Sequence, residues 1–100
     1  MIYHITTAVA WQAAQLAGVY TADSLQLEGF IHFSRVTQLP RVAAKFYRGQ
    51  TGLVLITVDP ARLSAELRDE EGEPGEQFPH LYGPLNLDAV VTVEPFLPPQ

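Results

Sequence analysis

The sequence contains no cysteine. This absence excludes a disulfide framework, a thiol nucleophile and a thiolate zinc site. Long apolar runs are also missing, since none approaches the roughly 20 residues that a membrane-spanning helix needs. Tyr3 and His4 interrupt the amino terminus, where a signal peptide would carry a basic and then an apolar segment. These absences predict a cytoplasmic protein that does not enter a membrane.

Basic residues are few, with 6 Lys and Arg against 11 Asp and Glu, for a net charge of -5. General binding to nucleic acid depends on clustered cations that neutralise phosphates, so this balance argues against it. Arg35, Arg41, Lys45 and Arg48 nevertheless cluster in one segment. For the last three we favour the solvated face of a helix, which leaves a local anion site beside Arg35.

Residues 28–47, EGFIHFSRVTQLPRVAAKFY, predict a strand followed by a turn and a helix. Residues 30–33 form a short apolar run between turn-forming residues, which is typical of a buried strand. From Leu39 onward, apolar residues recur at the spacing of one helical face. Pro40 suits the first turn of this helix, and Gly49 suits its end.

His32 lies in the middle of this predicted strand. The two-residue alternation of a strand places its ring on one face, and Ile31 and Phe33 on the other. If the face that carries the ring is an open cleft, His32 contacts a ligand. The alternative is a buried histidine whose nitrogens bond to backbone groups.

The first part of the chain predicts a strand, a helix and a loop. Residues 2–5 have the alternation of a strand. Thr6 or Thr7 is expected to cap a helix that ends at Gly18. Residues 19–27 lack a helical period and predict a loop with one helical turn at most.

The second half predicts four strands around an acidic loop. Residues 52–58, GLVLITV, have the apolar, β-branched character of a central strand, and residues 64–68 suit an edge strand. Residues 69–77, DEEGEPGEQ, combine like charges with Gly and Pro and predict an exposed, mobile loop. Residues 78–82 and 87–96 are expected to form the last two strands.

These segments predict one α+β domain that spans residues 1–100, with two main helices segregated from a mostly antiparallel sheet. Its 47% apolar content is enough for one compact core but not for two.

Three histidines fall on predicted strands, namely His4, His32 and His80. If they converged, they would form a three-nitrogen zinc site with an open fourth position. Their spacing matches no compact metal motif, so we predict no metal site. Ser34 lacks the Gly-x-Ser-x-Gly turn of serine hydrolases, and no Gly-x-Gly-x-x-Gly or phosphate loop occurs.

The remaining hypothesis is a cleft lined by imidazoles and phenols. Aromatic faces with hydrogen-bonding edges suit a flat heteroaromatic ligand, and an arginine beside a helix amino terminus suits phosphate. This chemistry predicts a nucleotide or dinucleotide, although each tyrosine has the alternative of lying at the edge of the core. The residues expected in the cleft are His4, His32, His80, Tyr3, Tyr20, Tyr82, Ser34, Arg35 and Asp88.

Several motifs together resemble a known family. EGFIHFS at residues 28–34, LVLITVD at 53–59, FPHLYGPLNLDAVV at 78–91 and the Ile-Tyr-His of residues 2–4 are similar to the bacterial domain-of-unknown-function 952 family over nearly the whole chain. That family resembles the ADP-ribosyltransferase superfamily in fold. The superfamily includes the RNA 2'-phosphotransferases, which act on an RNA phosphate using NAD. The resemblance implies an ADP-ribosylation-like split sheet with an NAD-type cleft.

The resemblance also implies roles for single residues. His4 matches a first-strand histidine that contacts the adenosine-side ribose and the nicotinamide amide. His32 and Ser34 lie in a segment that resembles the His-Val-His-Leu-Ser of the phosphotransferases. Asp88 lies near the position of the transferases' catalytic Glu, but it is Asp here, and only Arg35 is placed to replace the phosphotransferases' two arginines. Without the Glu, transfer loses the group that holds the ribose hydroxyl.

Two functions therefore stay open. The first is an NAD-dependent ADP-ribosyl or RNA 2'-phosphotransferase-like enzyme with His32 and Asp88 as catalytic residues. The second is a non-catalytic module that binds nucleotides or a partner, which the missing Glu favours. The expected ligand is NAD or a related nucleotide-type small molecule, and the first function would add a specific RNA end. The residues expected to bind it are His4, Tyr20, Ser34, Arg35, His80 and Tyr82.

Overall fold

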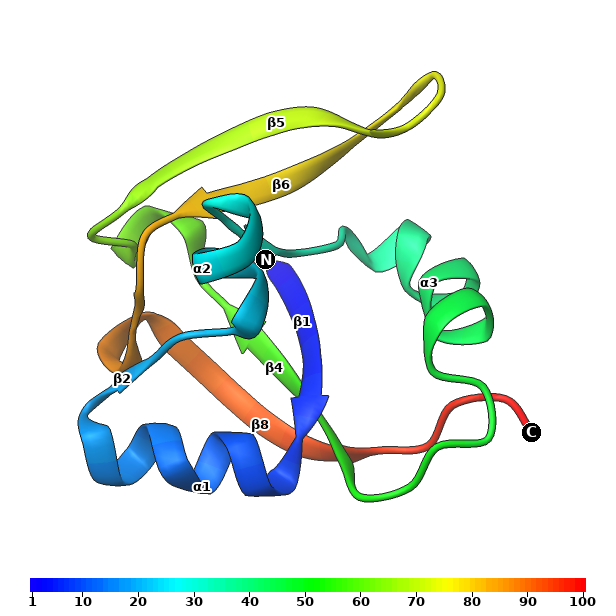
Figure 1. The fold of residues 1–100 in the computed structure, drawn as a ribbon, viewed down its shortest axis with the longest axis horizontal. Coiled ribbons are helices and arrows are strands. Elements are labelled where there is room, and N and C mark those ends of the chain that lie inside the picture. Colours follow the sequence, from blue (N-terminus) through cyan, green and yellow to red (C-terminus); the bar gives the residue numbers. More distant parts are fainter.

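Three small antiparallel sheets form the scaffold, in a computed structural model that describes residues 1–100. In the first sheet, β4 (Leu53–Val58) lies between β1 (Ile2–Thr7) and β8 (Val90–Phe96), as Figure 1 shows. No side chain of β4 is exposed. This confirms the prediction that the apolar, β-branched segment is a central strand.

The other two sheets are built from shorter pairings. β2 (Val19–Tyr20) pairs with β7 (Leu85–Asn86). In the third sheet, β6 (Glu76–Tyr82) lies between β3 (Ile31–His32) and β5 (Glu66–Glu73). The fold is therefore of the mixed α+β class, with antiparallel sheets and few helices.

A single bridge joins the first sheet to the third. The backbone N–H of Tyr3 donates to the carbonyl of Ser34 at 2.9 Å, and the N–H of Ser34 donates back to the carbonyl of Tyr3 at 2.8 Å. Because Ser34 follows β3 closely, this bridge holds β1 against the end of β3. The residues of β1 and those around β3, on either side of the bridge, are thereby brought together.

Three α-helices surround the sheets. α1 (Ala8–Ala17) begins where the hydroxyl of Thr7 accepts from the N–H of Ala10 at 3.0 Å, and it ends at Gly18, which has a φ of 83°. The left-handed conformation of Gly18 explains why a glycine stands there. α3 (Leu39–Phe46) follows the 3₁₀ turn η1 (Val36–Gln38). Both helices lie where the sequence predicted them.

The core lies between the three sheets. Its most deeply buried side chains come from all of them and are Ile31, Phe33, Ile56, Val58, Leu81 and Leu85. Within β3, Ile31 is buried and His32 is exposed, which confirms the predicted alternation. A smaller second cluster of Ile5, Ala43 and Leu53 lies under α3. No helix has both the length and the apolar character needed to cross a membrane.

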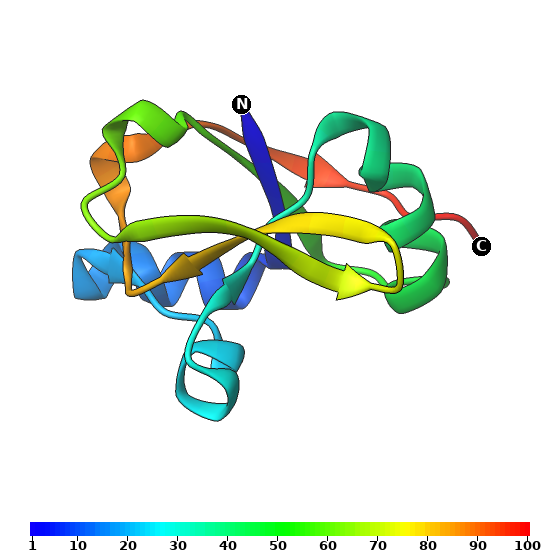
Figure 2. The ribbon, with the colours of Figure 1, turned by 90° about the horizontal axis from the view of Figure 1, so that it is seen from above.

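The prediction of a mobile loop at residues 69–77 is wrong, because most of these residues belong to the β5–β6 hairpin. Asp69 pairs with Pro79 and Glu71 with Gln77, and the hairpin extends to a turn at Gly75. Basic residues far away in the sequence hold it, since Arg35 bonds to Asp69 at 2.6 Å and Lys45 to Glu73 at 2.7 Å, and Arg41 bonds to Glu76. Figure 2 shows the tip of the hairpin beside α3.

Two further boundaries differ from the prediction. Residues 19–27, expected as a loop, contain β2 and most of a third helix, α2 (Asp23–Glu28), which ends at Gly29 with a φ of 91°. The predicted strand at 87–96 begins only at Val90. Residues 87–89 form the 3₁₀ turn η3, in keeping with Asp88 and Ala89, residue types that are depleted in strands.

Leu81 is 0% exposed at the centre of the core, so removing its side chain leaves a cavity between the sheets. We expect Leu81→Ala to lower the free energy of unfolding by about 2–5 kcal/mol in urea denaturation. The matched control is Leu16→Ala on α1, where the side chain is 88% exposed and the change should stay within about 0.5 kcal/mol. Equal losses in the two variants would contradict this placement of the core.

Candidate functional site

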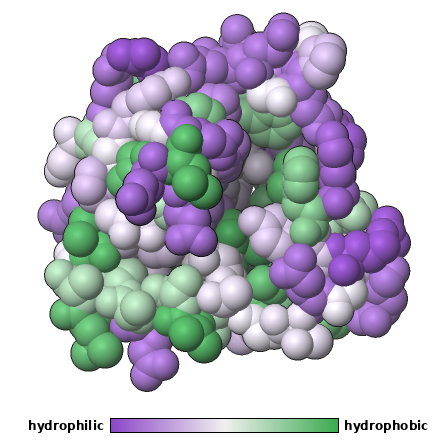
Figure 3. Space-filling model, in the orientation of Figure 1, coloured by the Kyte–Doolittle hydropathy of each residue, from purple (hydrophilic) through white to green (hydrophobic).

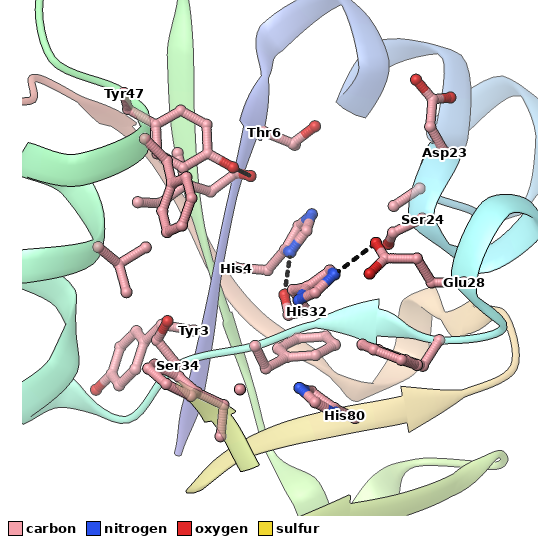
Figure 4. A pocket seen from close by; sticks show the side chains of 18 of the residues that line it. Tyr3, His4, Thr6, Asp23, Ser24, Glu28, His32, Ser34, Tyr47 and His80 are labelled. Carbon is pink, nitrogen blue, oxygen red and sulfur yellow. Dashed lines mark hydrogen bonds and ion pairs between the residues drawn. The ribbon is translucent and has the colours of Figure 1, made fainter. Parts of the chain in front are cut away.

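A pocket of about 560 Å³ opens between α2 and α3, where the surface is hollowed in Figure 3. β1 forms its floor, and α2 and α3 form opposite walls (Figure 4). The segment around β3 and the β5–β6 hairpin closes the remaining side. The pocket therefore lies where the Tyr3–Ser34 bridge joins two sheets.

His4 forms hydrogen bonds through both ring nitrogens. Its Nδ1 lies 2.6 Å from the backbone oxygen of His32, and its Nε2 lies 2.7 Å from the hydroxyl of Tyr20. Because a carbonyl only accepts, the proton of the neutral ring is on Nδ1, and Tyr20 must donate to Nε2. The hydroxyl of Thr6, 3.0 Å from that of Tyr20, is then left to donate to the phenol oxygen.

Burial keeps His4 neutral. The residue is 8% exposed, and burial lowers the pKa of its imidazole to about 4, although the bond to the carbonyl of His32 acts in the opposite direction. Burial likewise raises the pKa of Tyr20, whose hydroxyl stays protonated. At neutral pH the hydrogen bonds therefore run in one direction, from the hydroxyl of Thr6 to Tyr20 and from Tyr20 to His4.

His32 turns its ring away from the core and into the pocket. Its side chain is 53% exposed, and its Nε2–H donates to the carboxylate of Glu28 at 2.9 Å (Figure 4). Of the two alternatives for this residue, the structure has the exposed ring. The histidine that is buried and bonded to backbone is His4, and the backbone oxygen belongs to His32.

His80 lies in the pocket wall beneath Phe30. The two rings stack with their centroids 4.0 Å apart, and His80 is 3% exposed. Its Nδ1–H donates to Glu70 at 3.1 Å, whereas its buried Nε2 has no partner. Glu70 also accepts from the hydroxyl of Tyr82, and these two bonds hold the pKa of Glu70 below its usual range.

The pocket brings together five of the eight residues that were predicted to act in catalysis or binding. These are His4, Tyr20, His32, Ser34 and His80, and Tyr3, expected in the cleft, also lines the pocket.

Tyr82, Arg35 and Asp88 do not line the pocket. Tyr82 shares a face of β6 with His80, but its hydroxyl is bound to Glu70. Arg35 is engaged by Asp69, and Asp88 on η3 accepts from the side-chain amide of Asn86. The partners of Arg35 and Tyr82 lie on β5, whereas Asp88, expected near a catalytic Glu from the family resemblance, is bonded by Asn86 two residues earlier.

Residue types and spacing did not point to the lining residues of α2, nor to Thr6 on β1. Glu28 bonds to His32 four positions later, and Asp23 and Ser24 line the same wall. The signal for Glu28 was present, since it opens the EGFIHFS motif that contains His32. Asp23 and Ser24 had no comparable signal because their segment was expected to be a loop. For Thr6 the sequence predicted only a possible role as a helix cap.

The three histidines are not arranged to share a metal ion. Both nitrogens of His4 are used within the protein, and no group of three His, Asp or Glu side chains comes together as a ligand set. The chemistry available at the pocket is hydrogen bonding, aromatic contact and charge from carboxylates.

Residues 5–93 match the model of the DUF952 family, which is described as proteins of unknown function. The chain belongs to the DUF952 family. This confirms the family predicted from the sequence, while the more distant likeness to ADP-ribosyltransferases stays a prediction.

Solved structures of another protein are similar to this DUF952 chain. The crystal structure of protein CC0527 from Caulobacter crescentus has 37% identity and a TM-score of 0.87, over 94% of this chain and 83% of that one. The solution NMR structure of CC0527 also has 37% identity, with a TM-score of 0.82 over 94% and 82% of the two chains. No curated protein matches the sequence.

The lowered pKa of His4 predicts a pH-dependent stability. Between about pH 6.5 and 4 the unfolded chain binds the proton and the folded chain does not, so the free energy of unfolding falls as pH drops through this range. The loss from His4 alone should be about 3 kcal/mol. We expect His4→Asn to be less stable than the wild type at pH 7.5 in urea denaturation, and the difference to shrink toward pH 4. A difference independent of pH would contradict a buried neutral His4.

Removing the phenol hydroxyl of Tyr20 leaves Nε2 of His4 buried without a donor. We expect Tyr20→Phe to lower the free energy of unfolding by about 1–3 kcal/mol. Tyr47→Phe is the matched control, because the hydroxyl of Tyr47 makes only a 3.3 Å bond to the carbonyl of Ile5 and its loss should cost less. A larger loss for Tyr47→Phe would contradict this ranking of the two bonds.

Proposed function

We propose that the pocket binds NAD or a related nucleotide through its nucleoside end. The observation that carries this proposal is the convergence of the His4 network and the exposed His32–Glu28 pair in one pocket. Its volume of about 560 Å³ falls within the range of small-molecule sites, about 300–1,000 Å³.

Aromatic side chains support a flat ring as the bound group. Phe30, Phe78, Tyr3 and Tyr47 line the pocket, and Phe30 is already stacked on His80. Such faces bind heteroaromatic rings by stacking. The base or the nicotinamide of a nucleotide therefore has a surface to lie on.

Polar groups support a sugar beside that ring. Thr6, Ser24 and Ser34 contribute hydroxyls, and Glu28 contributes a carboxylate on the same side as His32 (Figure 4). Carboxylates and hydroxyls are suitable partners for ribose hydroxyls. Glu28, rather than Asp88, is the carboxylate placed to hold one, because Asp88 lies outside the pocket.

We infer an ADP-ribosylation-like fold, supported by two separate three-stranded antiparallel sheets that meet beside the pocket. The resemblance of the motifs around His4 and His32 to that superfamily points the same way.

Glycosyl transfer from NAD is the reaction this site would support. Glu28 would hold a ribose hydroxyl and stabilise the positive charge that develops on the sugar as the bond to nicotinamide breaks and nicotinamide leaves as a neutral molecule. Water or an acceptor hydroxyl would form the new bond to that sugar carbon, and His32 would receive its proton. Phosphotransfer has less support, since no Lys or Arg lines the pocket.

A non-catalytic nucleotide-binding module is the second candidate. One observation favours it: Glu28, the carboxylate in the best position, is already bonded to His32. In this function the pair would be a fixed part of the binding surface.

Titration with NAD tests binding, and release of labelled nicotinamide tests catalysis. We expect a rise in melting temperature equivalent to about 2.7 kcal/mol when NAD is present at about 100 times its dissociation constant. His32→Gln should weaken binding about tenfold, with little effect on stability because the ring is half exposed.

Nicotinamide release, with or without an RNA that bears a 2'-phosphate, would assign the enzyme function, and binding without release would assign the module. No stabilisation by NAD, nicotinamide mononucleotide or AMP would contradict the proposal.

A further inference from the structure

The pocket has charges of one sign only. Asp23, Glu28, Glu71 and Glu73 line it, and no Lys or Arg does. Glu73 is paired with Lys45 at 2.7 Å and Glu28 with His32 at 2.9 Å, whereas Asp23 and Glu71 have no ion pair. A phosphate placed among these groups would meet repulsion, and Lys45, the cation beside the pocket, is already paired with Glu73, so the phosphate would be costly to hold away from bulk water.

The hydrogen bonds inside the wall leave an acceptor oxygen on Thr6 and an unpartnered nitrogen on His80. The hydroxyl proton of Thr6 is used by Tyr20, so the oxygen of Thr6 is left to accept. His80 donates from Nδ1 to Glu70, and its buried Nε2 has no partner within the protein. The acceptor oxygen of Thr6, together with the carboxylates, indicates a ligand that donates hydrogen bonds to the wall, and the unpartnered nitrogen of His80 leaves room for a further bond.

Aromatic faces accompany these acceptors. Phe30, Phe46 and Phe78 are among the lining residues, and the ammonium of Lys45 already lies 5.3 Å from the ring of Phe46. Aromatic faces combined with carboxylates attract organic cations, because the negative face of a ring and the negative oxygens act together.

We propose that the pocket selects a cationic, hydrogen-bond-donating ring without phosphates, and that any phosphates of a larger ligand stay outside it. The inference rests on the proposed function for the identity of the ring, which is then the pyridinium of an oxidised nicotinamide nucleoside. Nicotinamide riboside carries this charge and no phosphate. Nicotinamide mononucleotide adds a phosphate, and ADP-ribose has phosphates without the cation.

Isothermal titration of the full chain with these compounds tests the proposal. We expect nicotinamide riboside to bind several-fold more tightly than nicotinamide mononucleotide, and ADP-ribose to bind at least tenfold more weakly than NAD. Added salt should reduce the preference for the riboside, since screening weakens both the attraction and the repulsion.

Three variants sharpen the test. Glu28→Gln keeps an acceptor for His32 but removes the charge, and it should weaken riboside binding about five- to tenfold. Glu71→Lys reverses an exposed charge at the rim and should make the mononucleotide the better ligand. Glu94→Gln is the matched control, because Glu94 on β8 lies outside the pocket and forms no ion pair, and it should change neither affinity. Circular dichroism checks that each variant is folded.

The outcomes separate this inference from the proposed function. ADP-ribose binding as tightly as NAD would overturn the selection for a cation and leave nucleotide binding standing. Binding of N-methylnicotinamide, a cationic ring without a sugar, with no binding of nucleosides or nucleotides would support the cation site and overturn the proposed function. If none of these compounds binds, both are overturned.

Discussion

One buried imidazole ties the three sheets together. His4 belongs to β1 of the first sheet, accepts a hydrogen bond from Tyr20 on β2 of the second, and donates to the carbonyl of His32 on β3 of the third. Loss of either partner would lower the free energy of unfolding by about 1–3 kcal/mol, because the ring is almost fully buried and an unsatisfied polar atom there is not solvated. β2 and β3 are only two residues long, so their positions depend on such contacts more than on their own ladders.

The same constraint shapes the pocket. Since Ile31 and Phe33 are buried in the core, the strand alternation turns the ring of His32 to the opposite face, where Glu28 holds it, while the carbonyl of His32 accepts from His4. On the other side of His4, Tyr20 fixes the hydroxyl of Thr6. A structural hydrogen-bond network thus sets the direction of the polar groups that a ligand meets, and the carboxylates of α2 and β5 set the sign of the charge.

Local patterns were enough to predict β1, α1, α3, β4 and the central part of β3, because periodicity and capping residues lie within each segment. The hairpin over 69–77 could not be predicted in this way, since its acidic strands are held by Arg35, just before η1, and by Lys45 on α3, about 30 residues earlier in the chain. The same distinction between local patterns and tertiary partners applies to the candidate site. His32 was found from its own motif, whereas the placement of Tyr82 depends on Glu70, a partner that the β5–β6 pairing brings to it. Asp88 is bonded by its near neighbour Asn86.

Histidine-selective ¹H–¹⁵N NMR of the full chain is the most direct test of the central claim, because it reports the protonated nitrogen of each ring and the pH at which that changes. The account predicts that His4 is the neutral Nδ1–H form at pH 7, keeps a sharp Nδ1–H signal protected from exchange, and titrates at about pH 4. A His4 ring that is protonated on Nε2, exchanges freely, or titrates near the ordinary value of about 6.5 would contradict it.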